Sequence, residues 1–191
     1  MKAFHKEGHM FMKSPSIFRD GDFDGCRSDK SEALEFSRHA DGESITIGGN
    51  KYIVRGQFRL HSPSADLQKI YSLYCITEEN LNSHDERLSN FGNSAVVILD
   101  VKKYLERVSA AADSRSFEYE RDFVEYVQKE EHAGQMGPFR KYSELSYQSE
   151  YRILFHDRDK NDLSDFYIGD ITDISVLCSC RDALDMRIKS Y

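Results

Sequence analysis

Three aspartates at alternate positions near the start of the chain have a spacing that suits metal binding. Asp20, Asp22 and Asp24 lie in the stretch RDGDFDGCRSDKSE. Carboxylates in a DxDxDG pattern open the loop of an EF-hand, whose last position is a glutamate that binds calcium through both oxygens. The corresponding position here is Ser31. The pattern therefore lacks the ligand that anchors calcium, and a non-standard calcium or magnesium loop is the remaining metal-binding alternative.

Two arginines close to these aspartates offer another source of positive charge. Arg19 directly precedes Asp20, and Arg27 follows the end of the DxDxDG pattern. Closely spaced carboxylates repel one another unless a positive group neutralises them. We therefore expect a polar turn in which arginine–aspartate pairs fix the backbone, without bound calcium or magnesium.

A second polar stretch, KYSELSYQSEYRI, lies in the last third of the chain. On a strand, Gln148, Glu150 and Arg152 would share one face and Tyr147 would take the other, because side chains alternate. An amide, a carboxylate and a guanidinium in a row are costly to bury unless each has a partner. The pattern indicates either a polar cleft or a solvated face with a structural Glu150–Arg152 pair.

The two stretches follow each other in a recognisable order. The front one reads FMKSPSIFRD, from Phe11 to Asp20, and the back one combines Lys141 with YQSEYR, residues 147–152. With FGNSAVVILD and FVEYV between them, they resemble an uncharacterised family of bacterial and phage cytoplasmic proteins, some of them abortive-infection-like. Gln148 stands where that family has the first acid of its E-x-E-x-R motif. The resemblance implies a fold and a setting of bacterial defence or phage counter-defence.

Two tripeptides carry a further resemblance. Gln148-Ser-Glu150 is a Q-x-E and Ser14-Pro-Ser16 is an S-x-S, and together they resemble the motifs of NAD-dependent ADP-ribosyltransferases. The second acid of that motif stabilises positive charge as the glycosidic bond breaks. The resemblance implies NAD as the cofactor, Glu150 as the catalytic carboxylate, Gln148 as the group that orients the acceptor, and Ser14 and Ser16 as supports of the nicotinamide pocket. These enzymes place an arginine before the serine motif, and this chain offers only His5 as a substitute.

The expected cleft lies where the first strand and its acidic turn meet the second polar stretch. In that arrangement Arg19, Arg27 and Arg152 would bind an anionic ligand, with Tyr147 beside them. Glu150 would be the one carboxylate with a catalytic role. The target of such a site is expected to be another macromolecule, a protein.

Two other classes of function stay open. The first is a non-enzymatic inhibitor that blocks a nucleic-acid-binding partner by presenting carboxylates where phosphates would lie, as the acid-rich stretches DGDFDG and EYERDFVEYVQKEE suggest. The second is a nuclease in which Asp20, Asp22 and Asp24 hold magnesium. Clustered acids on one tight loop leave little room for two metals and a phosphate, which places the nuclease third.

Composition limits the partners and the cellular setting. The 191-residue chain has 26 basic and 33 acidic residues and a net charge of -7, which argues against a broad nucleic-acid-binding surface. Its length suits one domain over residues 1–191. No apolar run is long enough to span a membrane, so we expect a cytoplasmic protein. The four cysteines are scattered and predict free thiols, whereas the oligomeric state stays open.

The elements that must position these residues predict a mixed α+β fold with more strand than helix. The hairpin SITIGGNKYIVRGQF has Ile45, Ile47, Tyr52 and Val54 on one face, which the alternation predicts to be buried. Asp100 predicts the start of a helix over VKKYLERVSAAA. The remaining apolar patterns predict strands over residues 9–18, 70–77, 94–99, 123–127, 147–155 and 165–168, and helices over 30–39 and 181–189.

Overall fold

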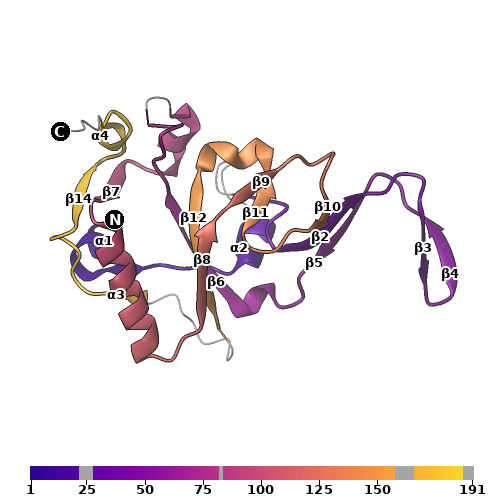
Figure 1. Ribbon diagram of the computed structural model, residues 1–191, viewed down its shortest axis with the longest axis horizontal. Coiled ribbons are helices and arrows are strands. Elements are labelled where there is room, and N and C mark those ends of the chain that lie inside the picture. The colour runs from indigo at the N-terminus through magenta and orange to yellow at the C-terminus, as the bar shows by residue number, and fades with distance from the viewer. Residues whose placement is uncertain (22–27, 82–83, 158–165, 187–191) are drawn as a thin grey trace.

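A three-stranded antiparallel sheet lies at the centre of the molecule. The computed structural model describes residues 1–21, 28–81, 84–157 and 166–186 (Figure 1). In the central sheet, β12 (Glu150–His156) pairs on one side with β6 (Gln68–Tyr74) and on the other with β8 (Tyr119–Phe123). The middle of β12, Ile-Leu-Phe, is fully buried and consists of residues that favour strands. This sheet therefore carries both the main core and the polar start of β12.

The main hydrophobic core forms where α3 (Val101–Ser114) packs near this sheet. Tyr104, Val108 and Ala112 are spaced by four residues, so they share one face of α3, and each is fully buried. They pack with Ile153 and other buried apolar residues from both ends of the chain. The Asp100 side chain accepts a hydrogen bond from the Lys103 N–H at 2.9 Å and caps the helix, which confirms the helix start predicted from the sequence.

Short elements surround this centre. Their bounds are α1 Lys2–Glu7, β1 His9–Met10, α2 Pro15–Asp20, β2 Leu34–His39, β3 Ser44–Ile47, β4 Asn50–Ile53, β5 Gln57–His61, β7 Ser94–Ile98, β9 Glu125–Val127, β10 Ala133–Gln135, β11 Arg140–Tyr142, β13 Phe166–Tyr167, β14 Ser175–Ser179 and α4 Cys180–Leu184, with 3-10 helices η1 Ala65–Leu67, η2 Glu86–Phe91 and η3 Ser143–Gln148. β1 pairs with β13, β7 with β14 and β9 with β11, and the last of these pairs is parallel. The strand-dominated α+β class predicted from the sequence is confirmed.

Residues 34–39, which the sequence analysis assigned to a helix, form strand β2 instead. β2 lies between β5 and β10, so backbone pairing on both edges overrides the helix propensity of the segment. A bulge between Leu34 and Phe36 interrupts the register with β5. The helix was predicted from helix-forming residues and from the apolar residues Ala33, Leu34 and Phe36. In the strand the buried residues are Leu34 and Ser37, three positions apart across the bulge.

The predicted hairpin forms, but its predicted burial is wrong. Gly48 and Gly49 make the turn between β3 and β4 with φ of 57° and 83°, as expected for a turn with two left-handed positions. Figure 1 shows the hairpin extending away from the rest of the molecule, at the end opposite both termini. As a result Ile47 is 60% exposed and Tyr52 is 50% exposed.

Several other predictions are confirmed with shifted bounds. The strands expected over 70–77 and 94–99 are β6 and β7, and the closing helix is α4. The strand expected over 147–155 begins only at Glu150, because η3 occupies the residues up to Gln148. In the first segment, only His9–Met10 is a strand, since Pro15 opens helix α2 at a position where its missing N–H has no cost.

Two further findings concern membrane segments and cysteines. Within the described ranges, no helix has both the length and the apolar character that crossing a bilayer requires. Cys75, Cys178 and Cys180 are free, as predicted, and Cys26 lies outside the described residues.

The fold predicts that Gly8→Ala is strongly destabilising. Gly8 ends α1 with φ of 64°, and a Cβ there would overlap the Gly169 carbonyl oxygen and lie 2.6 Å from Ile168 Cγ1. We expect a loss of at least about 2 kcal/mol in the free energy of unfolding, from strain and overlap together. Gly42→Ala is the matched control, because its φ is 80° with open space at the Cβ, so only the strain of roughly 1 kcal/mol remains. Equal losses for the two variants in urea titrations would contradict this assignment.

Candidate functional site

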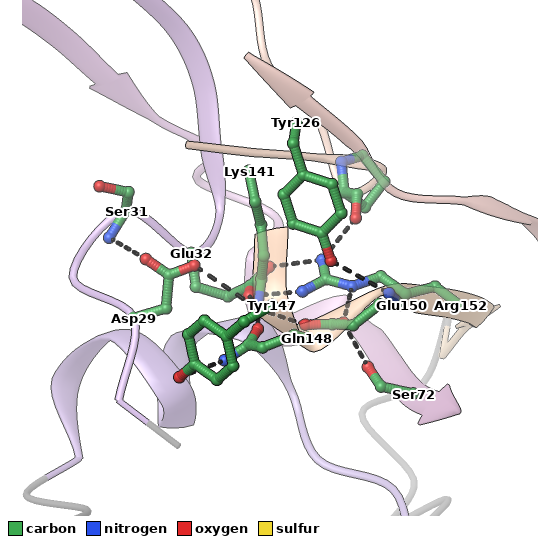
Figure 2. Close-up of polar contacts among 11 residues, drawn as sticks. Asp29, Ser31, Glu32, Ser72, Tyr126, Lys141, Tyr147, Gln148, Glu150 and Arg152 are labelled. Carbon is green, nitrogen blue, oxygen red and sulfur yellow. Dashed lines mark hydrogen bonds and ion pairs between the residues drawn. The ribbon is translucent and has the colours of Figure 1, made fainter. Parts of the chain in front are cut away.

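Six polar side chains meet in the interior at the start of β12, and we call them the charged cluster (Figure 2). Each is buried although each is charged or carries an amide. Such groups are rarely buried without a structural or functional reason, because removal from water costs several kcal/mol per ion. The members are Asp29, Glu32, Lys141, Gln148, Glu150 and Arg152. With all ionisable members charged, three carboxylates face two cations, so the cluster carries one excess negative charge.

Arg152 lies at the centre of the charged cluster. Its two terminal nitrogens donate to the two oxygens of Glu32 at 2.8 Å each, and Nε donates to Glu150 Oε2 at 2.8 Å. Nη1 also donates to the Pro138 carbonyl. Burial alone would lower the pKa of the guanidinium, but Glu32 and Glu150 outweigh it and raise the pKa above its ordinary value. Arg152 therefore stays charged, with its donors directed at protein acceptors.

Both carboxylate oxygens of Glu150 accept hydrogen bonds. Oε1 accepts from Lys141 Nζ at 2.5 Å, and Oε2 accepts from Ser72 Oγ at 2.9 Å as well as from Arg152. Burial alone would raise the pKa of this carboxyl, but Arg152 and Lys141 lower it to about 2. Its backbone N–H donates to the Tyr126 hydroxyl at 3.0 Å. Glu150 is therefore a fixed, ionised carboxylate over the physiological pH range.

Lys141 brings the remaining members together. Its Nζ donates to Gln148 Oε1 at 2.7 Å and to Glu150 Oε1 at 2.5 Å. The same nitrogen lies 3.8 Å from Asp29 Oδ2 and 3.7 Å from Glu32 Oε2. The parallel pairing of β11 with β9 places Lys141 opposite Tyr126, which fixes its backbone beside the start of β12. One ammonium thus contacts four acceptors.

The Q-x-E pair reaches Lys141 from two different elements. Gln148 is the last residue of η3 and Glu150 is the first of β12, so the two do not share a strand face as the sequence analysis expected. Ser149 between them has φ of 38°, and this left-handed turn lets both side chains contact the same ammonium. Glu150 and Arg152 do lie on β12 and are hydrogen-bonded to each other, which confirms the predicted pair, but both are buried, so the predicted solvated face is wrong.

Asp29 is the carboxylate with the opposite electrostatic surroundings. Burial raises the pKa of its carboxyl above the usual range, and the negative Glu32 adds to the rise, although Lys141 acts against it. Its Oδ1 accepts from the Ser31 N–H at 2.8 Å. When the surroundings of two carboxyl groups shift their pKa values in opposite directions, the group with the raised pKa takes up a proton more readily. Asp29 and Glu150 form such a pair.

Two members of the charged cluster, Asp29 and Glu32, were missed by sequence reasoning. They come a few residues after the three aspartates, and the DxDxDG pattern is the more conspicuous motif in this part of the sequence. The available signal was their spacing of three, which a turn with a Glu32 N–H to Asp29 carbonyl bond uses to present both acids together. Charged residues three positions apart are common on polar segments, so this spacing alone does not single out Asp29 and Glu32.

The predicted serines and Arg19 make contacts around α2. Ser14 Oγ lies 3.0 Å from Ser16 Oγ, and Ser16 donates to the Asp66 carboxylate. Arg19 pairs with its neighbour Asp20, with Nε to Oδ1 at 2.7 Å and Nη2 to Oδ2 at 2.6 Å. The pairing expected for the polar turn is thus present at its first aspartate. Three further predicted residues, Asp22, Asp24 and Arg27, lie outside the described residues.

Tyr147 and His5 have distinct surroundings. Tyr147 borders the charged cluster, where its hydroxyl accepts from Gln148 Nε2 at 3.4 Å (Figure 2). The Arg87 guanidinium lies 3.6 Å from the centre of its ring, and this cation–π contact fixes the ring. His5 lies on α1, with Nδ1 3.0 Å from Ser175 Oγ on β14. Ser175 in turn donates to the Ile171 carbonyl, so its hydroxyl serves a structural bond.

Across the ranges that the structure describes, no group of three or more His, Cys, Asp or Glu residues has an arrangement that could hold a metal ion. In comparisons with family models, with curated proteins and with solved structures, no match was found. The functional argument for this chain therefore rests on the contacts and charges of the cluster.

The charged cluster predicts a loss of stability in acid. A carboxyl with a lowered folded pKa stabilises the fold above its unfolded value of 4.5, and this stabilisation disappears as the pH falls toward about 2. For Glu150 the difference is worth roughly 3 kcal/mol. We expect the free energy of unfolding of the wild type to fall more steeply between pH 5 and about pH 2.5 than that of Glu150→Gln, measured by urea titration.

The exposed Glu144 on η3 supplies the control for this measurement. Glu144→Gln should keep the wild-type slope. Parallel curves for wild type and Glu150→Gln would mean that Glu150 titrates in the folded protein as it does in the unfolded chain.

Proposed function

We propose that the charged cluster is the centre of an NAD-dependent ADP-ribosyltransferase, with Glu150 as the catalytic carboxylate. The reaction breaks the bond between the ribose C1′ and the nicotinamide nitrogen, and nicotinamide leaves with the bonding electrons. C1′ then bonds to a nucleophilic atom of the acceptor, which gives up its proton. Positive charge develops on the ribose in between, so a fixed negative group beside it lowers the barrier.

The observation that carries this proposal is the state of the Q-x-E pair. Glu150 is ionised, with a pKa of about 2, and is oriented by three hydrogen bonds. Gln148 Oε1 accepts a hydrogen bond from the same Lys141 ammonium, so Gln148 lies beside Glu150. A carboxylate that is already oriented needs no reorganisation when positive charge appears, which is the main source of electrostatic catalysis.

The other members of the cluster support these two residues. Lys141 occupies Glu150 Oε1, and a ribose hydroxyl that binds this oxygen would replace the ammonium there. Asp29 and Glu32 lie 3.8 and 3.7 Å from the ammonium, so the lysine keeps counter-charges when it gives up that bond. Asp29, with its raised pKa, is suited to accept the proton that the acceptor releases. Gln148 would orient the acceptor.

Ligand recognition in this proposal falls to residues at the border of the cluster. The Tyr147 ring is partly exposed and held by Arg87, so it offers a fixed flat surface for a nicotinamide or adenine ring. Arg152 acts from within by holding Glu150, because its donors already contact Glu32, Glu150 and a carbonyl. NAD itself supplies the ribose electrophile and the leaving group.

The cellular role in this proposal follows from the family resemblance. The FMKSPSIFRD and YQSEYR stretches resemble those of an uncharacterised family of bacterial and phage proteins, some of them abortive-infection-like. A transferase that modifies a protein target in the cytoplasm would fit defence or counter-defence, since one enzyme molecule can alter many targets.

A second candidate is a non-enzymatic inhibitor of a nucleic-acid-binding protein. The observation that favours it is a run of exposed acids before, on and after β8, namely Glu118, Glu120, Asp122, Glu125, Glu130 and Glu131. Such a surface can occupy a basic groove in place of phosphates. An inhibitor of this kind acts at one molecule per target, whereas an enzyme acts at far lower ratios.

The proposal predicts that Glu150→Gln abolishes the release of nicotinamide from NAD while NAD binding persists. We expect a loss of at least about a hundredfold in rate, the usual scale for removing one electrostatic stabiliser of a transition state. The control is Glu144→Gln, which should keep wild-type activity. Nicotinamide release is measured by chromatography, and a shift in melting temperature reports NAD binding.

Because Glu150→Gln removes a carboxylate that both buried cations contact, a variant that keeps the charge balance is needed as well. Gln148→Ala removes the acceptor-orienting amide and should lower transfer to the acceptor more than NAD hydrolysis. Circular dichroism verifies the fold of both variants. A wild type that neither shifts in melting temperature nor releases nicotinamide at millimolar NAD would refute the transferase and favour the stoichiometric inhibitor.

A further inference from the structure

The hairpin β3–β4 is the distal half of a longer ribbon, and we call residues 40–56 the arm. The Ala40 N–H donates to the Gly56 carbonyl at 3.0 Å, and the Val54 N–H donates to the Glu43 carbonyl at 2.8 Å. These bonds continue the β2–β5 pairing outward into β3–β4. The arm therefore has a fixed connection to the molecule, although it extends away from it (Figure 1).

One side of the arm is apolar and exposed. Register places Ile45 opposite Tyr52, so these two share a face with Ile47 and Val54. Ile47 and Tyr52 are at least half exposed, and on the other face Ile53 is 61% exposed. A two-stranded ribbon has little stability without a surface that covers it. The arm has the composition of an element that is buried in an assembly.

The outer edge of the arm is basic. Lys51 lies on β4, Arg55 between β4 and β5, and Arg59 on β5 where the arm joins the molecule. All three are exposed, and the sequence from Asn50 to His61 contains no acid. In the described part of the chain, β4 pairs only with β3, and β5 pairs only with β2. The backbone of this edge is therefore available to an additional strand.

An acidic strand edge with matching features exists elsewhere in the same chain. β8 lies at the edge of the central sheet, with β12 as its one partner in the described ranges. It exposes Glu120 and Asp122, with Arg121 between them, and its terminal Phe123 is 59% exposed. An apolar side chain and two acids at an open edge complement a ribbon with apolar residues and three cations.

We propose that the arm docks on a second copy of this chain, with its basic edge beside the acidic β8 edge of that copy. The contact is reciprocal, so each copy contributes one arm and one β8 edge around a two-fold axis. Pairing of two arms with each other is disfavoured, because it would bring Lys51, Arg55 and Arg59 of both copies together. The proposal is independent of the reaction assigned to Glu150.

Charge reversal on each side of the contact gives the test. Lys51→Glu/Arg55→Glu makes the arm acidic, and Glu120→Lys/Asp122→Lys makes the β8 edge basic. In sedimentation equilibrium of the full chain, we expect the wild type to be a dimer and each variant alone to dissociate at least tenfold more readily. An equimolar mixture of the two variants should dimerise again, because both contacts of the mixed pair then join opposite charges.

Two controls separate this contact from general effects of charge and folding. Lys2→Glu/Lys6→Glu on the exposed surface of α1 changes the net charge by the same amount as the arm variant and should leave the dimer intact. Ile47→Ser/Tyr52→Ser removes only exposed apolar surface and should give a folded monomer. A monomeric wild type, an arm variant that still dimerises, or a mixture that stays monomeric would each overturn the proposal; the last outcome assigns the arm to a different partner.

Discussion

The contact between Arg152 and the two acids Glu32 and Glu150 constrains the rest of the structure. A buried guanidinium is tolerable only if carboxylates and carbonyls satisfy its donors, and Glu32 must therefore reach β12 from the turn before β2. This contact joins the central sheet to the β2–β5–β10 sheet, which has only a small apolar cluster of its own around Leu34, Met136 and Tyr142. The charged cluster thus holds the two sheets together, as the main hydrophobic core holds its elements together elsewhere in the molecule.

The same arrangement gives the cluster its chemical character. Arg152 and Lys141 keep Glu150 ionised, while burial and the neighbouring Glu32 make Asp29 more basic than an ordinary carboxyl. A structural ion pair needs one cation for each acid, whereas here three acids compete for two cations. The excess negative charge is what a developing ribosyl cation requires, which is why we connect the cluster with glycosidic bond cleavage. The acidic β8 edge and the apolar arm lie outside this cluster and belong to the proposed contact between two copies.

Local patterns predicted the elements in which one interaction dominates. Gly48-Gly49 and Asp100 act through backbone conformation and capping, so the hairpin and the start of α3 followed from the sequence. The segment 34–39 was mistaken for a helix because it has helix-forming residues and closely spaced apolar side chains, whereas pairing on both edges is not visible locally. In the site, Glu150 and Arg152 could be paired through strand alternation. Asp29 and Glu32 could not be placed beside them, since more than a hundred residues separate the two segments.

The titration of the Glu150 carboxyl carbon, followed by NMR with ¹³C-labelled glutamate, tests the central claim most directly. The account predicts that the Glu150 signal stays at the ionised position as the pH falls from 6 to about 3.5, below the ordinary range of a glutamate carboxyl. A Glu150 signal that moves to the protonated position within this pH range would contradict the account. In that case Arg152 and Lys141 would not hold an ionised carboxylate, and both the cohesion of the cluster and its proposed role with NAD would lose their basis.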